Sequence, residues 1–371
     1  MHIAIDAHSV GTQLAGNVTY ITSLIEALAE IDTSNQYTIY VTMPAAVERY
    51  AERWPNFNIR RTLPHFPLIR IPITLTAELR LRPVDVLLVQ YSGPIKPPCK
   101  LVTTIHDISY EHLPETFKRR SRFQMRMTIP RTARSADHVI ASSEYSRSDL
   151  IETYKLPPEK VTAIPLAAPD FLKPVTAVEE RERIRKKYGI DGEFILGVGS
   201  IQPRKNLRRL IAAYSSLAAS GIDLPQLVLA GKNAWLFEET LSSINENNLG
   251  EKVKFTGFVP DEDLPALYSA ALFFVYPSFF EGFGLPPLEA MQCGTPVIAG
   301  DRTSLPEVVG DSGLLVDPYD VDAIAEAIKR LLGDERLRNE LSLKGLHRAA
   351  LFSWKRTARQ TLDVIERAVN G

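Results

Sequence analysis

Short apolar runs alternate with amphipathic stretches along the whole chain, and this alternation constrains the fold most strongly. The first half contains HIAIDA, YTIYVTM, VDVLLVQ, KLVTTIHD and ADHVIASS, and the second contains FILGVGS, LPQLVLAG, KVKFTGFV, ALFFVYPS, TPVIAG and GLLVDP. Such runs, separated by segments with apolar residues at helical spacing, predict βαβ units. Parallel sheets built from these units carry helices on both faces. The sequence therefore predicts an α/β protein with two Rossmann-like sheets.

The length of the chain and its punctuation predict two domains. The chain has 371 residues, which is more than one ordinary hydrophobic core holds. A proline-punctuated and then highly charged stretch, residues 163–194, separates the two series of runs, and few strands could form there. We expect an N-terminal domain over residues 1–168 and a C-terminal domain over 169–352. Residues 353–371 have helical spacing, and we expect them to pack back onto the first domain.

Composition narrows the class of protein. The net charge is −1, which argues against a general nucleic-acid binder. Cys99 and Cys293 are far apart, so they predict neither a disulfide framework nor a metal site, and a reducing cytoplasm is the expected compartment. The first ten residues read as a strand rather than a signal peptide. The uncharged run 264–280 contains two prolines and predicts a buried helix followed by a buried strand.

Two cations follow the first predicted strand of the second half. After FILGVGS comes IQPRKNLRRLI, which places Arg204 and Lys205 on the turn before the next helix. In open parallel sheets, ligands bind beyond the carboxyl ends of strands, where helix N-termini direct backbone N–H groups outward. Fixed cations at such a position suit a diphosphate. A solvated basic turn is the alternative interpretation.

Two glutamates flank a glycine-containing turn further along the same half. Glu281 precedes the turn and Glu289 lies in the first turns of the short helix expected after it, within EGFGLPPLEAMQCG. One carboxylate can accept both hydroxyls of a vicinal diol. A nucleotide sugar carries polyols on both sides of a diphosphate, which matches two glutamates beside a phosphate-binding turn. The alternative is that both carboxylates only complement the helix dipole.

These motifs resemble a known family. The segment EGFGLPPLEAMQCGTPVIAGDRTSLPEVVGDSGLLVDP resembles the donor-site signature of the retaining glycosyltransferases of family four, which have the GT-B fold. GVGSIQPRKNL is similar to the family's diphosphate turn, FTGFVP to its base-binding loop and FSWKRTARQTLDVI to its crossover helix. The resemblance implies two Rossmann-like domains facing a central cleft, with a C-terminal helix that crosses back to the N-terminal domain.

The resemblance also implies roles for individual residues. Glu289 would bind the ribose, Glu281 would hold the donor sugar, and Arg204 and Lys205 would neutralise the leaving diphosphate. Many members place an arginine directly after the glycine that ends the strand, whereas this chain has Ser200 there, so Arg204 is the expected substitute. The other donor-binding residues implied are Gly16, Gly231, Gly257, Phe258, Val259, Phe283, Gly284 and Leu285.

Two features of the N-terminal half carry further expectations. His106 ends the strand in VTTIHDISYEHLPE, and the family uses the matching histidine near the donor sugar, although a purely structural histidine is the alternative. The run from Lys118 to Arg134 is basic, contains no acid and is interleaved with apolar residues. It predicts a solvated helix face, or else a surface for anionic lipid or a pyrophosphate-bearing acceptor. The residues of this acceptor or membrane hypothesis are Lys118, Arg119, Arg120 and Arg122.

No metal site is expected, and no cofactor beyond the nucleotide diphosphate sugar that serves as co-substrate. The D-x-D triplet of Asp261 and Asp263 would bind a metal in other glycosyltransferases. Here it opens an amphipathic helix, so we interpret Asp261 as the N-cap and Asp263 as a first-turn acid.

The expected reaction is transfer of a hexose to a hydroxyl of a sugar or a lipid-linked oligosaccharide in the cytoplasm, and peripheral contact with the cytoplasmic face of the inner membrane is a further hypothesis. IHDISYEHLPE resembles the mannosyl- and rhamnosyltransferases of O-antigen and exopolysaccharide assembly, which favours GDP-mannose. UDP-glucose, UDP-N-acetylglucosamine and dTDP-rhamnose stay open as donors. An inverting transferase or an epimerase would need His106 or Asp107 as a base. A catalytically silent sugar-nucleotide-binding subunit is the alternative from another class.

Overall fold

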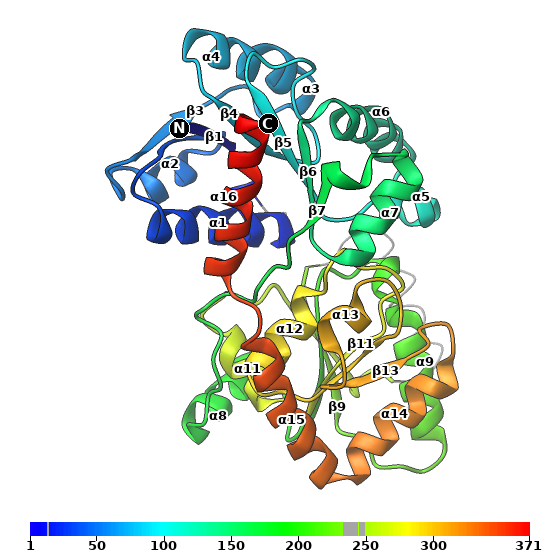
Figure 1. Ribbon diagram of the computed structural model, residues 1–371. Helices are drawn as coiled ribbons and strands as arrows, with labels where there is room; N and C mark the ends of the chain where they lie inside the picture. The colour runs from blue at the N-terminus through cyan, green and yellow to red at the C-terminus, as the bar shows by residue number, and fades with distance from the viewer. Residues whose placement is uncertain (13–14, 233–243, 245–248) are drawn as a thin grey trace. The chain divides into compact units, whose positions relative to one another are not determined.

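The chain forms two compact units (Figure 1). The computed structural model describes residues 1–12, 15–232, 244 and 249–371. The first unit comprises Met1–Leu166 together with Ser353–Gly371, and the second unit comprises Ala167–Phe352. The last helix of the chain therefore belongs to the first unit.

The first unit is built on a parallel sheet with strand order β3-β2-β1-β4-β5-β6-β7. The strands are β1 (His2–Asp6), β2 (Gln36–Val41), β3 (Phe57–Arg61), β4 (Val86–Gln90), β5 (Lys100–Ile105), β6 (His138–Ala141) and β7 (Val161–Ala163). The helices are α1 (Ala15–Ile31), α2 (Pro44–Tyr50), α3 (Pro67–Ile69), the π-helix η1 (Arg70–Leu75), α4 (Thr76–Leu81), α5 (Ser109–His112), α6 (Arg119–Ser135), α7 (Glu144–Tyr154) and α16 (Trp354–Asn370), with 3-10 turns η2 (Pro114–Thr116) and η3 (Pro158–Lys160).

The second unit repeats this plan with the order β10-β9-β8-β11-β12-β13. Its strands are β8 (Phe194–Val198), β9 (Gln226–Ala230), β10 (Val253–Gly257), β11 (Phe273–Tyr276), β12 (Val297–Gly300) and β13 (Leu314–Val316). Its helices are α8 (Val178–Tyr188), the 3-10 turn η4 (Pro203–Lys205), α9 (Leu207–Ala219), α11 (Leu264–Ala270), α12 (Leu285–Gln292), α13 (Leu305–Val309), α14 (Val321–Gly333) and α15 (Glu335–Ala349).

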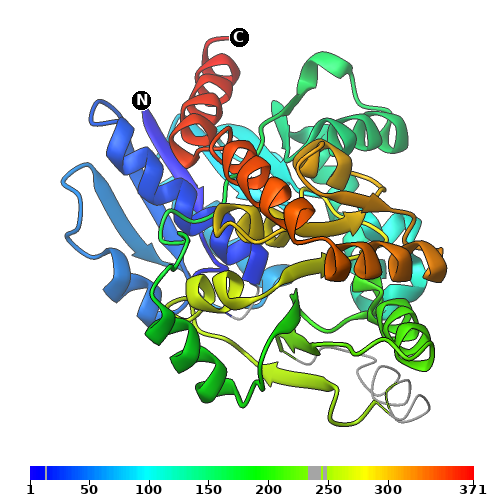
Figure 2. The ribbon, with the colours of Figure 1, turned by 90° about the horizontal axis from the view of Figure 1, so that it is seen from below.

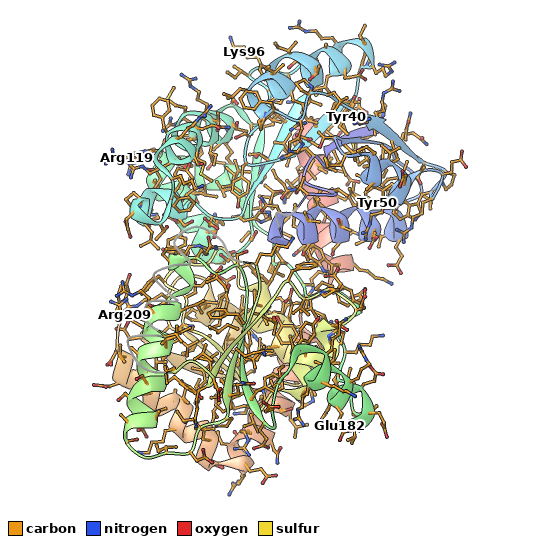
Figure 3. The ribbon with its side chains drawn as sticks, turned by 180° about the vertical axis from the view of Figure 1, so that it is seen from behind. Tyr40, Tyr50, Lys96, Arg119, Glu182 and Arg209 are labelled. Carbon is orange, nitrogen blue, oxygen red and sulfur yellow. The ribbon has the colours of Figure 1, made fainter. Side chains whose placement is uncertain are left out.

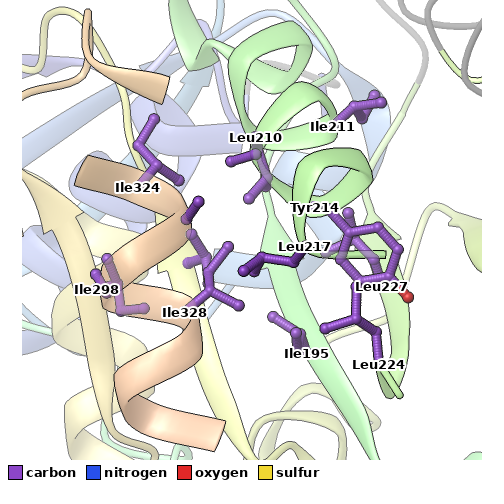
Figure 4. Close-up of a cluster of buried hydrophobic side chains, with 14 of the residues drawn as sticks. Ile195, Leu210, Ile211, Tyr214, Leu217, Leu224, Leu227, Ile298, Ile324 and Ile328 are labelled. Carbon is purple, nitrogen blue, oxygen red and sulfur yellow. The ribbon is translucent and has the colours of Figure 1, made fainter. Parts of the chain in front are cut away.

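Helix faces with apolar residues at the helical period form the cores. In the second unit, α9 buries Leu210, Tyr214 and Leu217, which lie on one side of the helix, and α14 buries Ile324 and Ile328 in the same cluster (Figure 4). Fully burying such a side chain contributes about 1.5–3 kcal/mol. In the first unit, the apolar side of α16 packs against α1 and the sheet (Figures 1 and 2).

Both sheets change direction once. In each sheet, the next strands in the sequence are added on one side of the first strand, and the later strands are added on its other side. The change of direction therefore falls between β1 and β4 in the first sheet and between β8 and β11 in the second. Ligands of open α/β sheets bind beyond the carboxyl ends of the two strands at such a point. The topology therefore places candidate sites after β1 and β4, and after β8 and β11.

The predicted fold class is confirmed, because both units contain parallel sheets covered by helices and the C-terminal helix returns to the first unit. The run 264–280 forms α11 and β11, as expected. Two strands of the first sheet, β3 and β7, were not predicted. Both lie at sheet edges, β3 ends in two arginines and β7 has only three residues. Among the described residues, none of the helices has the length and apolar character to cross a bilayer.

Candidate functional site

The turn after β8 and the loop after β11 meet at the direction change of the second sheet. Asn206 joins them, since its Nδ2 donates hydrogen bonds to the carbonyl oxygens of Pro277 at 3.0 Å and Pro318 at 2.6 Å. The backbone N–H of Phe279 also donates to the carbonyl of Arg204 at 3.0 Å. These bonds fix the segment that carries the two cations beside the segment that carries Glu281.

Glu281 is the centre of an ion cluster. Its Oε1 accepts hydrogen bonds from Lys205 Nζ at 2.7 Å, Ser278 Oγ at 2.5 Å and Tyr276 OH at 3.0 Å. Its Oε2 lies 2.9 Å from Nη1 of Arg204. The three charged side chains are only 8–15% exposed, so water screens these interactions weakly. We call Arg204, Lys205, Tyr276, Ser278 and Glu281 the carboxylate cluster.

The cluster keeps Glu281 ionised. Burial alone would raise the pKa of Glu281, but the charges of Arg204 and Lys205 and the hydrogen bonds from Lys205 and Ser278 lower it to about 2. Three of the four donors contact Oε1, and only Arg204 contacts Oε2. The arrangement therefore suits Glu281 to holding the two cations in place.

Glu289 has a different environment. It lies on α12 and accepts a hydrogen bond of 2.8 Å from the hydroxyl of Tyr268, and among the described residues it forms no ion pair like those of Glu281 with Arg204 and Lys205. Burial raises the pKa of Glu289 to about 7, although the hydrogen bond from Tyr268 opposes this shift. At neutral pH this carboxyl group is thus poised between its neutral and ionised forms.

Hydrogen bonds to Thr303 and Ser304, which lie in a neighbouring loop, hold the turn between the two glutamates in place. Ser304 Oγ donates to the carbonyl oxygens of Glu281 and Phe283, both at 2.8 Å, and Thr303 Oγ1 accepts from the backbone N–H of Glu281 at 3.0 Å. Gly284 has φ +112°, and a Cβ there would lie 2.8 Å from a methyl group of Leu305. This position therefore requires glycine, and the turn that starts α12 is rigidly defined.

The remaining donor-site residues of the second unit lie at the same edge of the sheet. Ser200 lines a small cavity together with Lys205 and Tyr276. Gly231 directly follows β9, and a Cβ there would lie 2.0 Å from the carbonyl oxygen of Gly199, so close packing against that carbonyl excludes a side chain. Gly257, with φ +70°, is the last residue of β10. It is followed by Phe258, which is 60% exposed beneath Lys232 Nζ, and by the buried Val259.

The interpretation of Asp261 as a helix N-cap is wrong. Helix α11 begins at Leu264 with Asp263 before it, and the side chain of Asp263 caps nothing. It instead accepts hydrogen bonds from Lys187 Nζ at 2.5 Å and Tyr188 OH at 2.7 Å, because α8 packs against α11. Burial would raise the pKa of Asp263, but these bonds lower it. In the part of the chain that the structure describes, no group of three or more His, Cys, Asp or Glu residues could hold a metal ion.

In the first unit, His106 is buried at the end of β5. Its Nδ1 lies 2.6 Å from Ser142 Oγ and its Nε2 lies 3.3 Å from Gln90 Oε1. The ring packs edge-on against Tyr20. Burial lowers the pKa of His106 to about 4, so the imidazole is neutral at pH 7. Asp107 accepts hydrogen bonds from the N–H and the hydroxyl of Ser109, at 2.9 and 2.6 Å.

A cavity of about 350 Å³ lies at the direction change of the first sheet. His8 and Ser9 after β1, and Gln90 to Ser92 at the end of β4, contribute to its lining. Gly16, in the first turn of α1, is exposed, while residues 13 and 14 of the same glycine-containing loop lie outside the described residues. Lys118, Arg119 and Arg120 are exposed and Arg122 is half-buried, at the start of α6.

Sequence reasoning missed the hydroxyl partners of the two glutamates. Tyr276 and Ser278 flank the end of β11, and Tyr268 lies on α11. Tyrosines in these apolar segments read as core residues. A signal was nevertheless present, because a tyrosine that ends a buried strand places its hydroxyl beyond the sheet, on the edge where ligands bind.

Comparison with known proteins identifies the family. Residues 15–168 match the family model described as Glycosyltransferase Family 4, and residues 180–348 match the one described as Glycosyl transferases group 1. The chain is similar to the O-antigen chain mannosyltransferase B of Escherichia coli, with 38% identity over 264 residues that cover 71% of this chain and 69% of that protein. It is also 38% identical over 231 residues to the serotype-specific mannosyltransferase WbdA of E. coli, but these cover only 28% of WbdA's length.

The fold has solved counterparts. Sucrose-phosphate synthase from Thermosynechococcus elongatus matches with a TM-score of 0.78 over 99% of this chain and 98% of that chain, at 24% sequence identity. WaaG, a glycosyltransferase involved in lipopolysaccharide biosynthesis, matches with a TM-score of 0.75 over 98% of this chain and 99% of that chain, at 18% identity. At these identities the likeness concerns the fold alone. Together with the two family models and the relative aligned over most of both chains, it shows that this chain is a glycosyltransferase and belongs to family four.

Proposed function

We propose that this enzyme transfers mannose from GDP-mannose to a hydroxyl of a glycan in polysaccharide assembly, with retention of anomeric configuration. The observation that carries the proposal is the carboxylate cluster, which fixes two cations beside the start of α12 at the direction change of the second sheet. The names of the similar proteins support mannose as the transferred sugar. UDP-glucose, UDP-N-acetylglucosamine and dTDP-rhamnose are the competing donors.

In the proposed reaction, the bond between the anomeric carbon and the diphosphate oxygen breaks while the acceptor hydroxyl forms a new bond on the same face. A leaving-group oxygen takes the acceptor proton. Arg204 and Lys205 stabilise the negative charge that develops on the diphosphate, and their fixed positions avoid reorganisation during the reaction. In this proposal the two cations supply the charge that a metal ion supplies in other transferases, so no metal is required.

Glu289 completes the proposed donor site as the acceptor for the two ribose hydroxyls. Its environment supports this role because, among the described residues, the Tyr268 hydroxyl is the one side-chain donor that contacts it, which leaves acceptor capacity for a diol. Glu281 would be a positioning residue, because it would hold Arg204 and Lys205 in place beside the diphosphate of the donor. The cavity at the direction change of the first sheet is the proposed acceptor site.

A thermal-shift screen tests the proposal. Ligands that bind only the folded state stabilise it, by about 2.7 kcal/mol at a concentration of 100 times the Kd. We expect GDP-mannose to raise the melting temperature by several degrees, and to do so more than UDP-, dTDP- or ADP-sugars at the same concentration. A larger shift with another nucleotide sugar would replace mannose as the donor, and no shift with any of them would refute the assigned donor site.

The affinity for the donor should depend on pH through Glu289. The ribose hydroxyls donate hydrogen bonds, so the ionised carboxylate is the binding form, and protonation near pH 7 competes with the donor. We expect the Kd of the nucleotide sugar to rise by about tenfold between pH 8 and pH 6. Calorimetric titration measures it, with a nucleotide sugar rather than a free diphosphate, because a terminal phosphate itself titrates near pH 6.

The control for this pH dependence is Glu289→Gln, whose amide does not titrate. This variant should bind the donor more weakly than the wild type at pH 8 and with a Kd that is nearly constant from pH 6 to pH 8. If the variant kept the wild-type pH profile, another group would be responsible and the contact between Glu289 and the ribose would be wrong.

A further inference from the structure

The exposed apolar side chains of the first unit are concentrated in one region. Among the described residues, sixteen large hydrophobic side chains are exposed, and nine of them belong to residues 63–127. Five of these nine lie on or directly beside α3, η1, the loop after β4 and α6, and are 48–68% exposed: Phe66, Leu68, Ile73, Ile95 and Phe123. Single exposed apolar residues are ordinary, whereas a group of them indicates an interaction surface.

The cavity of the first unit shows that these segments form one continuous surface. Leu68 of α3, Ile95 of the loop after β4 and Met127 of α6 all line it, and α3 and α6 lie at the same end of the unit (Figure 1). Phe123 is one helical turn before Met127 and therefore lies on the same face of α6. We call Leu68, Ile95, Phe123 and Met127 the apolar surface.

Basic residues accompany the apolar surface without acidic ones. Residues 63–75, 91–99 and 119–135 contain no Asp or Glu, and α6 alone carries six arginines. One of them, Arg126, pairs with Glu111, and Arg131 lines the cavity. Figure 3 labels two basic residues of these segments, Lys96 and Arg119. Of the described residues that line the cavity, none is acidic.

We propose that this surface docks on an anionic lipid bilayer. Apolar side chains of this size insert at the boundary between headgroups and acyl chains, and arginines beside them bind lipid phosphates. A second copy of the chain fits less well, because a two-fold contact through this surface would bring two sets of arginines against each other. The surface would hold the first unit on the membrane by contacts that do not involve the donor site, so the inference goes beyond the proposed function.

Vesicle co-sedimentation of the full chain tests the docking. We expect tighter binding to vesicles of equal parts phosphatidylglycerol and phosphatidylcholine than to phosphatidylcholine alone, in about 0.1 M NaCl, where exposed charges still interact over roughly 10 Å. Ile95→Ser combined with Phe123→Ser should lower this binding at least tenfold. Arg119→Gln combined with Arg120→Gln should lower it by about fivefold per cation.

The matched control is Leu343→Ser combined with Leu351→Ser. These leucines of the second unit are 61% and 53% exposed, so the control removes a similar apolar area elsewhere and should leave vesicle binding unchanged. Donor-induced thermal shifts of all variants should equal that of the wild type and verify folding. Equal binding to both vesicle types, or wild-type binding by the Ile95 and Phe123 variant, would overturn the proposal. A dimer in sedimentation analysis that Phe123→Ser abolishes would assign the surface to a second copy instead.

Discussion

Replacing Lys205 with methionine should lower the turnover number by about 10²–10³-fold, the usual cost of removing one donor that stabilises developing negative charge. The ammonium group of Lys205 is nearly buried and fixed by Glu281 and Tyr276, so its loss removes one of the two cations proposed to face the diphosphate, and Arg204 would remain as the other. Methionine keeps most of the side-chain volume and removes the charge. Release of nucleoside diphosphate from the donor identified by the thermal screen measures the effect.

The matched control for Lys205 is Lys329→Met. Lys329 lies on α14 in the same unit, is 58% exposed and pairs with Glu326, so its replacement removes a cation far more accessible to water. Its turnover number should stay within about twofold of the wild type, since surface substitutions are usually small in effect. If the turnover number of Lys205→Met were as close to that of the wild type as the turnover number of Lys329→Met, the role of Lys205 in leaving-group stabilisation would be contradicted.

Glu281→Gln should destabilise the second unit by an amount that depends on pH. The pKa of Glu281 falls from 4.5 in its ordinary state to about 2 in the folded protein. A carboxyl group with a lowered folded pKa contributes its full stabilisation above the ordinary pKa and loses it as the pH falls toward the folded pKa. The contribution at pH 7 is about 3 kcal/mol, and at pH 3 it should be less than half of that.

Calorimetric melting measures this difference. A loss of about 3 kcal/mol corresponds to a decrease of roughly 6–12 °C in the melting temperature of a unit of this size. We expect that decrease for Glu281→Gln at pH 7 and a smaller one at pH 3, while Glu326→Gln, at an exposed site on α14, should melt like the wild type at both. A decrease of equal size at both pH values would mean that the charge of Glu281 is not what stabilises the fold.

The six strands of the second sheet and the five inner strands of the first could be predicted from the sequence, and the two edge strands of the first sheet could not. The predicted strands coincide with apolar runs. For an inner strand this is expected, because a strand covered by helices on both sides needs apolar residues at successive positions. β3 pairs with only one neighbour and carries Arg60 and Arg61. Its backbone hydrogen bonds depend on the position of β2, which no local pattern encodes.

In the candidate site, too, some features could be predicted from the sequence and others could not. The positions of Arg204, Lys205, Glu281 and Glu289 after their strands could be inferred, because parallel strands end at a common edge. Their different environments could not. Glu281 is held by two cations, whereas Glu289 is buried and accepts a hydrogen bond from Tyr268, and only three-dimensional packing decides which carboxylate is ionised. Asp263 was misread for the same reason, since its partners Lys187 and Tyr188 are distant in sequence.

The membership of α16 in the first unit has a consequence for biosynthesis. The first unit is made of two separate stretches of chain, whereas the second is one uninterrupted stretch that ends at Phe352. Domains generally fold as units during synthesis, from the N-terminal end onward. Here the order is reversed in part: the second unit is complete as soon as Phe352 has left the ribosome, while the core of the first still lacks Val364 and Ile365 of α16. Of the two units, the one begun first is thus finished last, and the nascent chain must keep the uncovered face of α1 from aggregating until α16 has been synthesised.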